Sequence, residues 1–310
     1  MATSSITEHG EHRLAIDVQG LTCRYDDFVA VDGLDLTVRE GELFALLGTN
    51  GAGKTTALET IQGLRQPDGG AVTVLGLDIA ADRAAAMSRC GVMLQETGYA
   101  DELTVRETVG LLGALSGRDD DPDRLLDLAG LVGRRDVRVG QLSGGERRRL
   151  DFAVAAYGSP KLLFLDEPTT ALDPAAREAL WAGVQLMRDA GTTIVLTTHY
   201  LEEAERYADR VAVMSQGRIV QQGTVAEVLG RRPSRITFRA DPSTVLPVAA
   251  VAEPDGSVEI DTFDPQTDLL ALLTWASRTR TPLEQLEVSG ARLEEIFLDT
   301  ERAGAPTAAV

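Results

Sequence analysis

The residues of this sequence most able to do chemistry form a glycine-rich loop. Residues 48–55 read Gly-Thr-Asn-Gly-Ala-Gly-Lys-Thr and directly follow the apolar run 43–47. Glycines let backbone N–H groups converge on an anion, and the start of a following helix adds positive potential. This spacing predicts a nucleotide-phosphate site, although a glycine-rich strand-to-helix turn with an incidental lysine has the same pattern.

Within this phosphate loop, each residue type has a defined use. Lys54 is expected to reach the β- and γ-phosphates, and the Thr55 hydroxyl is expected to bind Mg²⁺. The residues that we expect to hold the nucleotide here are Gly48, Asn50, Gly51, Ala52, Gly53, Lys54, Thr55 and Thr56.

Two adjacent acids end a second apolar run. Asp166 and Glu167 follow 162–165, which reads Leu-Leu-Phe-Leu. Ligands of open α/β sheets bind at the carboxyl ends of the strands, where Asp166 can hold the magnesium shell and Glu167 can activate a water molecule. Strand-end acids can also simply cap the next turn.

The elements that must position these groups alternate along the chain. From residue 14 to about 230, short apolar strands such as 42–48, 71–77 and 192–199 alternate with helical segments, which predicts an α/β domain with a mostly parallel sheet. The strand pattern stops over about 98–157. There Thr104 and Glu107 form a capping-box pattern and Pro122 favours a second helix start, so we expect a helical insertion.

The pattern changes again after 231–235. Strand-like runs are followed by two helices, and this order predicts a small α+β domain over 231–302. The first helix is expected to have one apolar face, formed by Leu269, Leu272, Leu273 and Ala276, and the last helix carries Leu293, Ile296 and Phe297. The polar ends 1–13 and 303–310 are expected to be tails, the first of them disordered.

Composition limits the functional classes. The chain has 310 residues, 44% of them hydrophobic, and a net charge of −18, which disfavours binding to nucleic acid. We find neither an apolar run of about 18 residues nor a secretion signal, so we expect a cytoplasmic protein without a membrane span. Cys23 and Cys90 lie far apart and are expected to be small buried residues, not metal ligands.

Further motifs complete a family pattern. Besides the phosphate loop and the two acids, the chain has "LSGGE" at 142–146, Gln95 after "GVML", "ALD" at 171–173 and His199 after "TTIVLTT". In this order the six motifs resemble the ATP-binding subunits of ABC transporters over residues 14–230. The resemblance implies a P-loop NTPase sheet core with a helical insertion, and ATP and Mg²⁺ as cofactors.

The resemblance also implies roles for single residues. Glu167, His199 and Gln95 are the catalytic candidates, and Thr55, Gln95 and Asp166 are the metal ligands. Tyr25 is expected to stack on adenine. Five residues are expected to act across a dimer. Four of them contact the ATP of the partner chain, and the last communicates between the two chains: Ser143, Gly144, Gly145, Glu146 and Asp173.

Several of these residues have simpler explanations. Ser143 and Glu146 match a capping box, and Asp173 before Pro174 matches an N-cap. Tyr25 could pack in the core. The run 147–149, three arginines, is typical of a solvated face, although it could also offset the charge of Glu146 beside the partner's γ-phosphate.

The resemblance implies an assembly as well. One chain would contain half of each active site, so a second copy must join it head to tail around two ATP molecules. The permease must be a separate polypeptide. Residues 289–304, "SGARLEEIFLDTERAG", resemble the end of ATPase subunits of bacterial drug-resistance exporters of the daunorubicin-resistance type. We therefore expect an exporter subunit on the cytoplasmic face of the membrane; an importer subunit or a non-transport ABC ATPase is the alternative.

Overall fold

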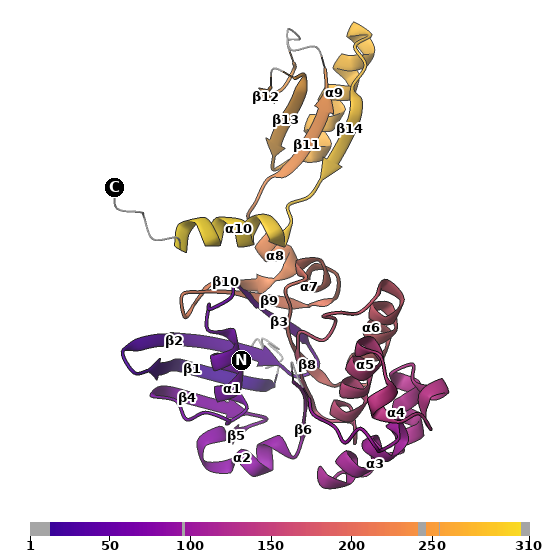
Figure 1. Cartoon of the computed structure of the whole chain (residues 1–310). Coiled ribbons are helices and arrows are strands. Elements are labelled where there is room, and N and C mark those ends of the chain that lie inside the picture. The colour runs from indigo at the N-terminus through magenta and orange to yellow at the C-terminus, as the bar shows by residue number, and fades with distance from the viewer. Residues whose placement is uncertain (1–12, 95–96, 241–245, 254, 305–310) are drawn as a thin grey trace, which may run out of the picture. The chain divides into compact units, whose positions relative to one another are not determined.

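The computed structural model describes residues 13–94, 97–240, 246–253 and 255–304 (Figure 1). The chain forms two compact units. Unit 1 contains the residues up to Gln222 and those from Ala303 onward, and unit 2 contains Gly223–Arg302. The expected N-terminal tail lies outside the described residues except for Arg13, and so does 305–310.

A six-stranded sheet forms the centre of unit 1. Its strand order is β10-β9-β3-β8-β7-β6, and the pairs that join β9, β3, β8, β7 and β6 are parallel. The strands are β3 (Leu43–Gly48), β6 (Cys90–Met93), β7 (Leu162–Asp166), β8 (Thr193–Thr197), β9 (Arg210–Ser215) and β10 (Arg218–Thr224). β3 and β8 are buried along their whole length, as expected for a sheet covered on both faces. The predicted parallel α/β core is confirmed.

A second sheet of unit 1 differs from the expectation. The run 71–77 belongs to an antiparallel sheet of order β2-β1-β4-β5, and not to the parallel one. The strands are β1 (Leu14–Tyr25), β2 (Phe28–Arg39), β4 (Gly69–Val74) and β5 (Leu77–Asp78). Buried and exposed residues alternate along much of β1 and β2, which is the pattern of a sheet with one covered face. An apolar run alone does not fix which sheet a strand joins.

Helices complete unit 1. They are α1 (Lys54–Ile61), α2 (Ile79–Met87), α3 (Val105–Leu115), α4 (Pro122–Leu128), α5 (Gly144–Ala155), α6 (Pro174–Asp189) and α7 (Leu201–Tyr207). Figure 1 shows α3, α4 and α5 grouped together, well apart from the antiparallel sheet. The Thr104 capping box opens α3, with the Thr104 N–H donating to Glu107 Oε2 at 2.8 Å, and Pro122 is the first residue of α4. The predicted helical insertion is therefore present.

Unit 2 is a small α+β domain. Its sheet has the order β12-β13-β11-β14 and its strands pair antiparallel. The elements are α8 (Val225–Leu229), β11 (Ser234–Arg239), β12 (Val251–Ala252), β13 (Ser257–Thr262), α9 (Pro265–Thr279), β14 (Glu284–Ser289) and α10 (Leu293–Gly304). The core contains Leu272 together with residues of β11 and β13. Leu273, expected on the same buried face, is 46% exposed, because it points away from the sheet that Leu272 covers.

Two further expectations concern the described part of the chain. Both cysteines are free and buried, as predicted. None of the described helices has the length and apolar character needed to cross a bilayer.

Candidate nucleotide site

Most of the predicted phosphate-loop residues, together with Tyr25, the two acids and His199, meet at an open cleft of about 370 Å³ in unit 1. The cleft lies where the parallel strands β3, β7 and β8 end, so residues far apart in the sequence become neighbours. It is lined by Tyr25, Phe28, Ala30, Thr49, Asn50, Gly51, Gly53, Lys54, Thr55, Thr56, Asp166, Glu167 and His199. We call this the nucleotide cleft.

The phosphate loop needs glycine where the sequence provides it. Gly53 precedes α1 with φ 101°, a conformation that side chains rarely adopt, and a Cβ there would lie 2.3 Å from the Ala30 carbonyl oxygen. A Cβ on Gly48 would lie 2.4 Å from the Met214 carbonyl oxygen. The Ala52 side chain belongs to the buried core, and the Ala52 N–H donates to the Thr49 carbonyl oxygen at 3.1 Å within the loop. The loop is thus held tightly between β3 and α1.

Lys54 places its ammonium group at this loop. Its Nζ donates to the carbonyl oxygens of Gly48 at 2.5 Å and Thr49 at 3.0 Å. Burial lowers the pKa of Lys54, while the carboxylates of Glu167 and Asp166 oppose this shift. Within the described part of the chain, no side chain caps the start of α1, so the first N–H groups of this helix have no competing side-chain acceptor there.

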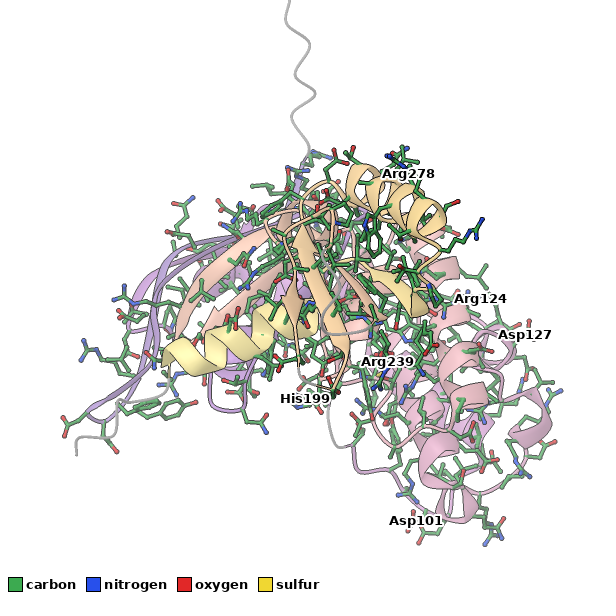
Figure 2. The ribbon with its side chains drawn as sticks, turned by 90° about the horizontal axis from the view of Figure 1, so that it is seen from above. Asp101, Arg124, Asp127, His199, Arg239 and Arg278 are labelled. Atoms are coloured by element: carbon green, nitrogen blue, oxygen red, sulfur yellow. The ribbon has the colours of Figure 1, made fainter. Side chains whose placement is uncertain are left out.

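The two acids at the end of β7 are held differently. The Thr197 hydroxyl of β8 donates to Asp166 Oδ1. Glu167 has φ 47°, and its carboxylate Oε1 lies 2.6 Å from His199 Nε2. His199 is labelled in Figure 2. The structure thus brings two of the expected catalytic residues into direct contact.

The donor set fits Mg²⁺ bound together with phosphate. The Thr55 hydroxyl and the Asp166 carboxylate line the same cleft, and both are oxygen ligands of the kind that Mg²⁺ prefers. Among the described residues, no three His, Cys, Asp or Glu side chains gather into a metal site of their own. Few protein ligands are expected where phosphate oxygens and water complete the shell. Gln95, the third expected ligand, lies outside the described residues.

Tyr25 lines the nucleotide cleft and does not pack in the core. Tyr25 is 46% exposed, and the neighbouring Phe28, which also lines the cleft, is 64% exposed. The Arg65 guanidinium lies 4.0 Å from the centre of the Tyr25 ring, and the Tyr25 hydroxyl lies 3.4 Å from Thr56 Oγ1. These contacts fix the ring beside the phosphate loop.

The signature residues lie outside the nucleotide cleft of the same chain. Ser143 caps α5, and the reciprocal bonds of a capping box are present: Glu146 N–H donates to Ser143 Oγ at 3.2 Å, and Ser143 N–H donates to Glu146 Oε2 at 2.9 Å. Asp173 caps α6 by accepting from the Ala176 N–H at 2.8 Å. These residues therefore act as helix caps, as their sequence patterns predicted.

The three arginines at 147–149 do not offset Glu146, contrary to our expectation. Glu146 Oε1 instead pairs with Arg134 Nε at 2.6 Å. The Ser143 N–H, together with Arg134, holds the pKa of Glu146 below its usual range. The reason is geometric: Arg147 and Arg148 follow Glu146 by one and two residues and so do not face it on the helix, and Arg149 donates to the Gly130 carbonyl oxygen instead.

The same three arginines also do not form a solvated face. Arg147 pairs with Asp101, labelled in Figure 2, at 3.2 Å. Arg149 donates to the Gly130 carbonyl at 3.1 Å. Arg148 is only 7% exposed and donates to the carbonyl oxygen of Glu167 at 2.8 Å. Sequence reasoning missed this contact, although Asp151 three residues later signals an internal ion pair.

Comparisons with known proteins agree with this geometry. Residues 31–170 match the ABC transporter family, and 234–291 match a C-terminal domain of ABC transporter domain-containing proteins. The chain is 37% identical over 304 residues to the daunorubicin/doxorubicin resistance ATP-binding protein of Streptomyces peucetius, covering 92% of this chain and 91% of that protein. The chain belongs to the ATP-binding subunits of ABC transporters. It is an ATPase, since this family hydrolyses ATP.

Other relatives of this ABC subunit are exporter subunits by name. The Nod factor export ATP-binding protein I of Rhizobium sp. (strain N33) is 37% identical over 304 residues, covering 92% of this chain and 96% of that protein. Among solved structures, an ATP-binding subunit of an ABC transporter matches with TM-score 0.64 and 28% identity, covering 69% of this chain and 91% of that one. A dimeric bacterial ABC transporter cassette matches with TM-score 0.61 and 25% identity, covering 68% and 98%.

Proposed function

We propose that this ABC subunit hydrolyses ATP to drive export of a drug-like or other hydrophobic substrate through a separate permease. The observation that carries the ATPase assignment is the nucleotide cleft, where Lys54, Asp166 and Glu167 from distant segments line one space. The exporter assignment is supported by the relatives named above, which are resistance and export proteins.

In this proposal the phosphate loop binds the phosphates of the nucleotide. The uncapped N–H groups of α1 and the Lys54 ammonium bind phosphate oxygens, and Tyr25 stacks on adenine. Thr55, Asp166 and Gln95 would hold Mg²⁺, which would supply positive charge beside the phosphates. Lys54 must exchange its bonds to loop carbonyls for bonds to phosphate, and its buried position strengthens that charge interaction.

Glu167 acts as the base for the attacking water. A positioned base typically contributes about 10²- to 10⁴-fold in rate. His199, in contact with Glu167 at 2.6 Å, orients the carboxylate and contacts the γ-phosphate. This role is supported by the position of both side chains, which line the cleft together with the phosphate loop.

The active site is completed by a second copy. Ser143, Gly144 and Gly145 do not line the nucleotide cleft of their own chain, so a partner is needed to bring a signature motif to each nucleotide. Solved structures of similar cassettes include dimers. ATP closes the head-to-tail dimer, hydrolysis opens it, and Asp173 at the start of α6 communicates across the interface. Permease movement follows this cycle.

Location and accessory structure follow from the same assignment. The subunit binds a permease at the cytoplasmic face of the membrane, and it does not bind nucleic acid. Residues 231–302 form an accessory domain after the ATPase domain of 14–230, although the two compact units divide at Gly223. Its proposed role is in dimer stability or permease pairing. An importer subunit would use the same cleft, so the direction of transport rests on the relatives alone.

The substitution Glu167→Gln tests the ATPase assignment. It removes the base but keeps the shape of the side chain, so ATP binding should persist while most turnover is lost. With ATP and Mg²⁺ the variant should accumulate as a dimer in size-exclusion chromatography, and Lys54→Ala should remain monomeric. An active Glu167→Gln variant, or one that stays monomeric with ATP, contradicts the proposal.

The direction of transport is tested with the permease present. Inside-out vesicles that contain the permease and this subunit should accumulate daunorubicin when ATP is added, and vesicles with Lys54→Ala should not. ATP-dependent loss of preloaded drug from these vesicles would assign an importer instead.

A further inference from the structure

Arg148, in the second turn of α5, joins three segments of unit 1. Its guanidinium is buried, and Nη1 donates to the Leu94 carbonyl oxygen at 2.5 Å. Nη2 donates to the carbonyl oxygens of Asp166 and, at 2.8 Å, Glu167. One planar group from α5 therefore binds the chain just after β6 and the two acids at the end of β7.

The guanidinium of Arg148 lies at a position where several backbone carbonyl groups need hydrogen-bond donors. The parallel register between β6 and β7 ends at the pair Met93 and Leu165, so the carbonyl groups just beyond need other donors. A guanidinium has five N–H donors in a fixed plane and can serve several carbonyl groups at once. Arg148 thus links the chain just after β6 to the end of β7 by hydrogen bonds to backbone carbonyl groups.

The guanidinium of Arg148 also contacts the side chain of Asp151, which in turn contacts Tyr99. Asp151, one turn along α5, places Oδ2 3.5 Å from Arg148 Nη1 and accepts a hydrogen bond from the Tyr99 hydroxyl at 2.6 Å. Burial lowers the pKa of Arg148 and raises the pKa of Asp151, while the contact between the two groups opposes both shifts. This pairing fixes the direction of the arginine side chain.

The backbone of Glu167 is restrained from both sides. Its φ of 47° is unusual for a residue with a side chain, and such conformations persist where neighbours impose them. The Glu167 N–H donates to the Thr197 carbonyl oxygen at 3.0 Å, and the Glu167 carbonyl accepts from Arg148. The left-handed backbone directs the carboxylate to His199 at the cleft.

We propose that Arg148 is a positioning residue for ATP hydrolysis, which holds the backbone of Glu167 so that its carboxylate points into the nucleotide cleft. The inference rests on the proposed role of Glu167 as the base. It goes beyond that role because it ties the carboxylate to α5, the helix that begins with the signature residues. Arg148 itself is not among the residues that line the nucleotide cleft.

Steady-state ATPase kinetics of Arg148→Gln and Arg148→Lys test the proposal. Arg148→Gln should lower kcat by about 100-fold, the size of effect expected from a misplacement near 1 Å. Its KM and its affinity for ATP should change by less than about threefold, because the phosphate loop is untouched. Arg148→Lys keeps the charge but has a single nitrogen, so it should lose less than the glutamine variant.

Matched variants separate positioning from folding. Arg148→Gln leaves the buried Asp151 without its cation, which can unfold the protein, so Arg148→Gln/Asp151→Asn removes both charges together. This double variant should fold, as judged by circular dichroism and thermal unfolding, and should show the same loss of kcat. Arg147→Gln, which breaks the exposed pair with Asp101, should behave as wild type.

A double-mutant cycle with Glu167→Gln gives the decisive readout. If Arg148 acts through Glu167, Arg148→Gln should cause no further loss of the residual rate once Glu167 is replaced. An equal loss in both backgrounds, or a folded Arg148→Gln variant with wild-type kcat, overturns the proposal. Failure of the proposed function itself looks different, because Glu167→Gln alone would then stay active.

Discussion

Two helices of unit 1 begin in glycine-rich segments, and their first turns are built in opposite ways. α1 begins after Gly53, whose left-handed backbone is followed by a turn that no side chain caps. α5 begins after Ser143, and the Glu146 side chain returns to the Ser143 N–H at 2.9 Å. The first helix start lines the nucleotide cleft, whereas the second lies outside it.

The difference shows how similar sequence features acquire different tasks. At α1, backbone N–H groups and the Lys54 ammonium together form a strong anion site. At α5, a carboxylate already occupies part of the helix start, and Arg134 balances that carboxylate at 2.6 Å. We therefore expect α1 to bind nucleotide in the single chain and α5 to bind it weakly, only when a partner supplies the remaining contacts.

Exchanging glycine for alanine at each helix start should give the largest contrast. Gly53→Ala places a Cβ 2.3 Å from the Ala30 carbonyl oxygen, so the loop must move. ATP affinity, measured by titration calorimetry, should fall at least about 100-fold, equivalent to two lost hydrogen bonds to a charged group.

Gly144→Ala is the matched control for that substitution. A Cβ at Gly144 meets nothing within 4 Å, and alanine favours the helix. ATP affinity of the single chain should therefore remain as in wild type. Equal losses of ATP affinity at the two positions would mean that both helix starts bind the nucleotide of one chain, and the comparison would be wrong.

Mixing two inactive variants tests whether the two helix starts act in different chains. Lys54→Ala keeps the α5 start intact, and Ser143→Arg keeps the phosphate loop intact. Mixed dimers then contain one complete site. Up to about one quarter of wild-type activity should return, because half of randomly formed dimers are mixed and each has one site of two. Mixtures that stay inactive while subunits exchange speak against the head-to-tail arrangement.

Charge at the α5 start should have a smaller effect. Arg134→Gln leaves the Glu146 carboxylate uncompensated near the partner's phosphates, so dimer closure should need more ATP, by about threefold, the upper range for an exposed pair. Adding Glu146→Gln should restore closure, since glutamine keeps the cap without the charge. Size-exclusion chromatography at increasing ATP measures both, and the difference should shrink as salt rises.

Two comparisons complete the test of this charge. Glu146→Ala should fare worse than Glu146→Gln, because alanine also loses the reciprocal cap at Ser143. Glu146→Gln alone should close its dimer only slightly more readily than wild type, since Arg134 already offsets the carboxylate. If Arg134→Gln closes at lower ATP than wild type, Arg134 opposes the interface and the charge argument is refuted.

Removing the C-terminal residues should have the smallest effect on nucleotide binding. Both helix starts and every residue that lines the nucleotide cleft lie before residue 200. Truncation after Arg232 should leave ATP affinity nearly unchanged and should reduce transport with the permease. A loss of affinity of about tenfold, or 1.4 kcal/mol, in a folded truncation would place part of the site beyond unit 1.

The sequence by itself determined features that depend on neighbouring residues. The spacing of the phosphate loop, the acids at the end of an apolar strand and the capping boxes at Thr104 and Ser143 were all predictable. Each of these requires only a few consecutive residues, because a capping box or a strand-to-helix turn is closed by bonds within about one helical turn. The role of Gln95 stays a prediction, since this residue lies outside the described part of the chain.

Only the tertiary structure decided how distant segments combine. The run 71–77 reads as an apolar strand, but its partner β1 places it in the antiparallel sheet. Leu273 reads as a core residue on α9, and it is exposed because the sheet covers only one face of that helix. Arg148 reads as one of three equivalent arginines, yet it alone reaches the carbonyl groups of Asp166 and Glu167. Such choices depend on contacts between segments far apart in the sequence, and local sequence patterns do not specify those contacts.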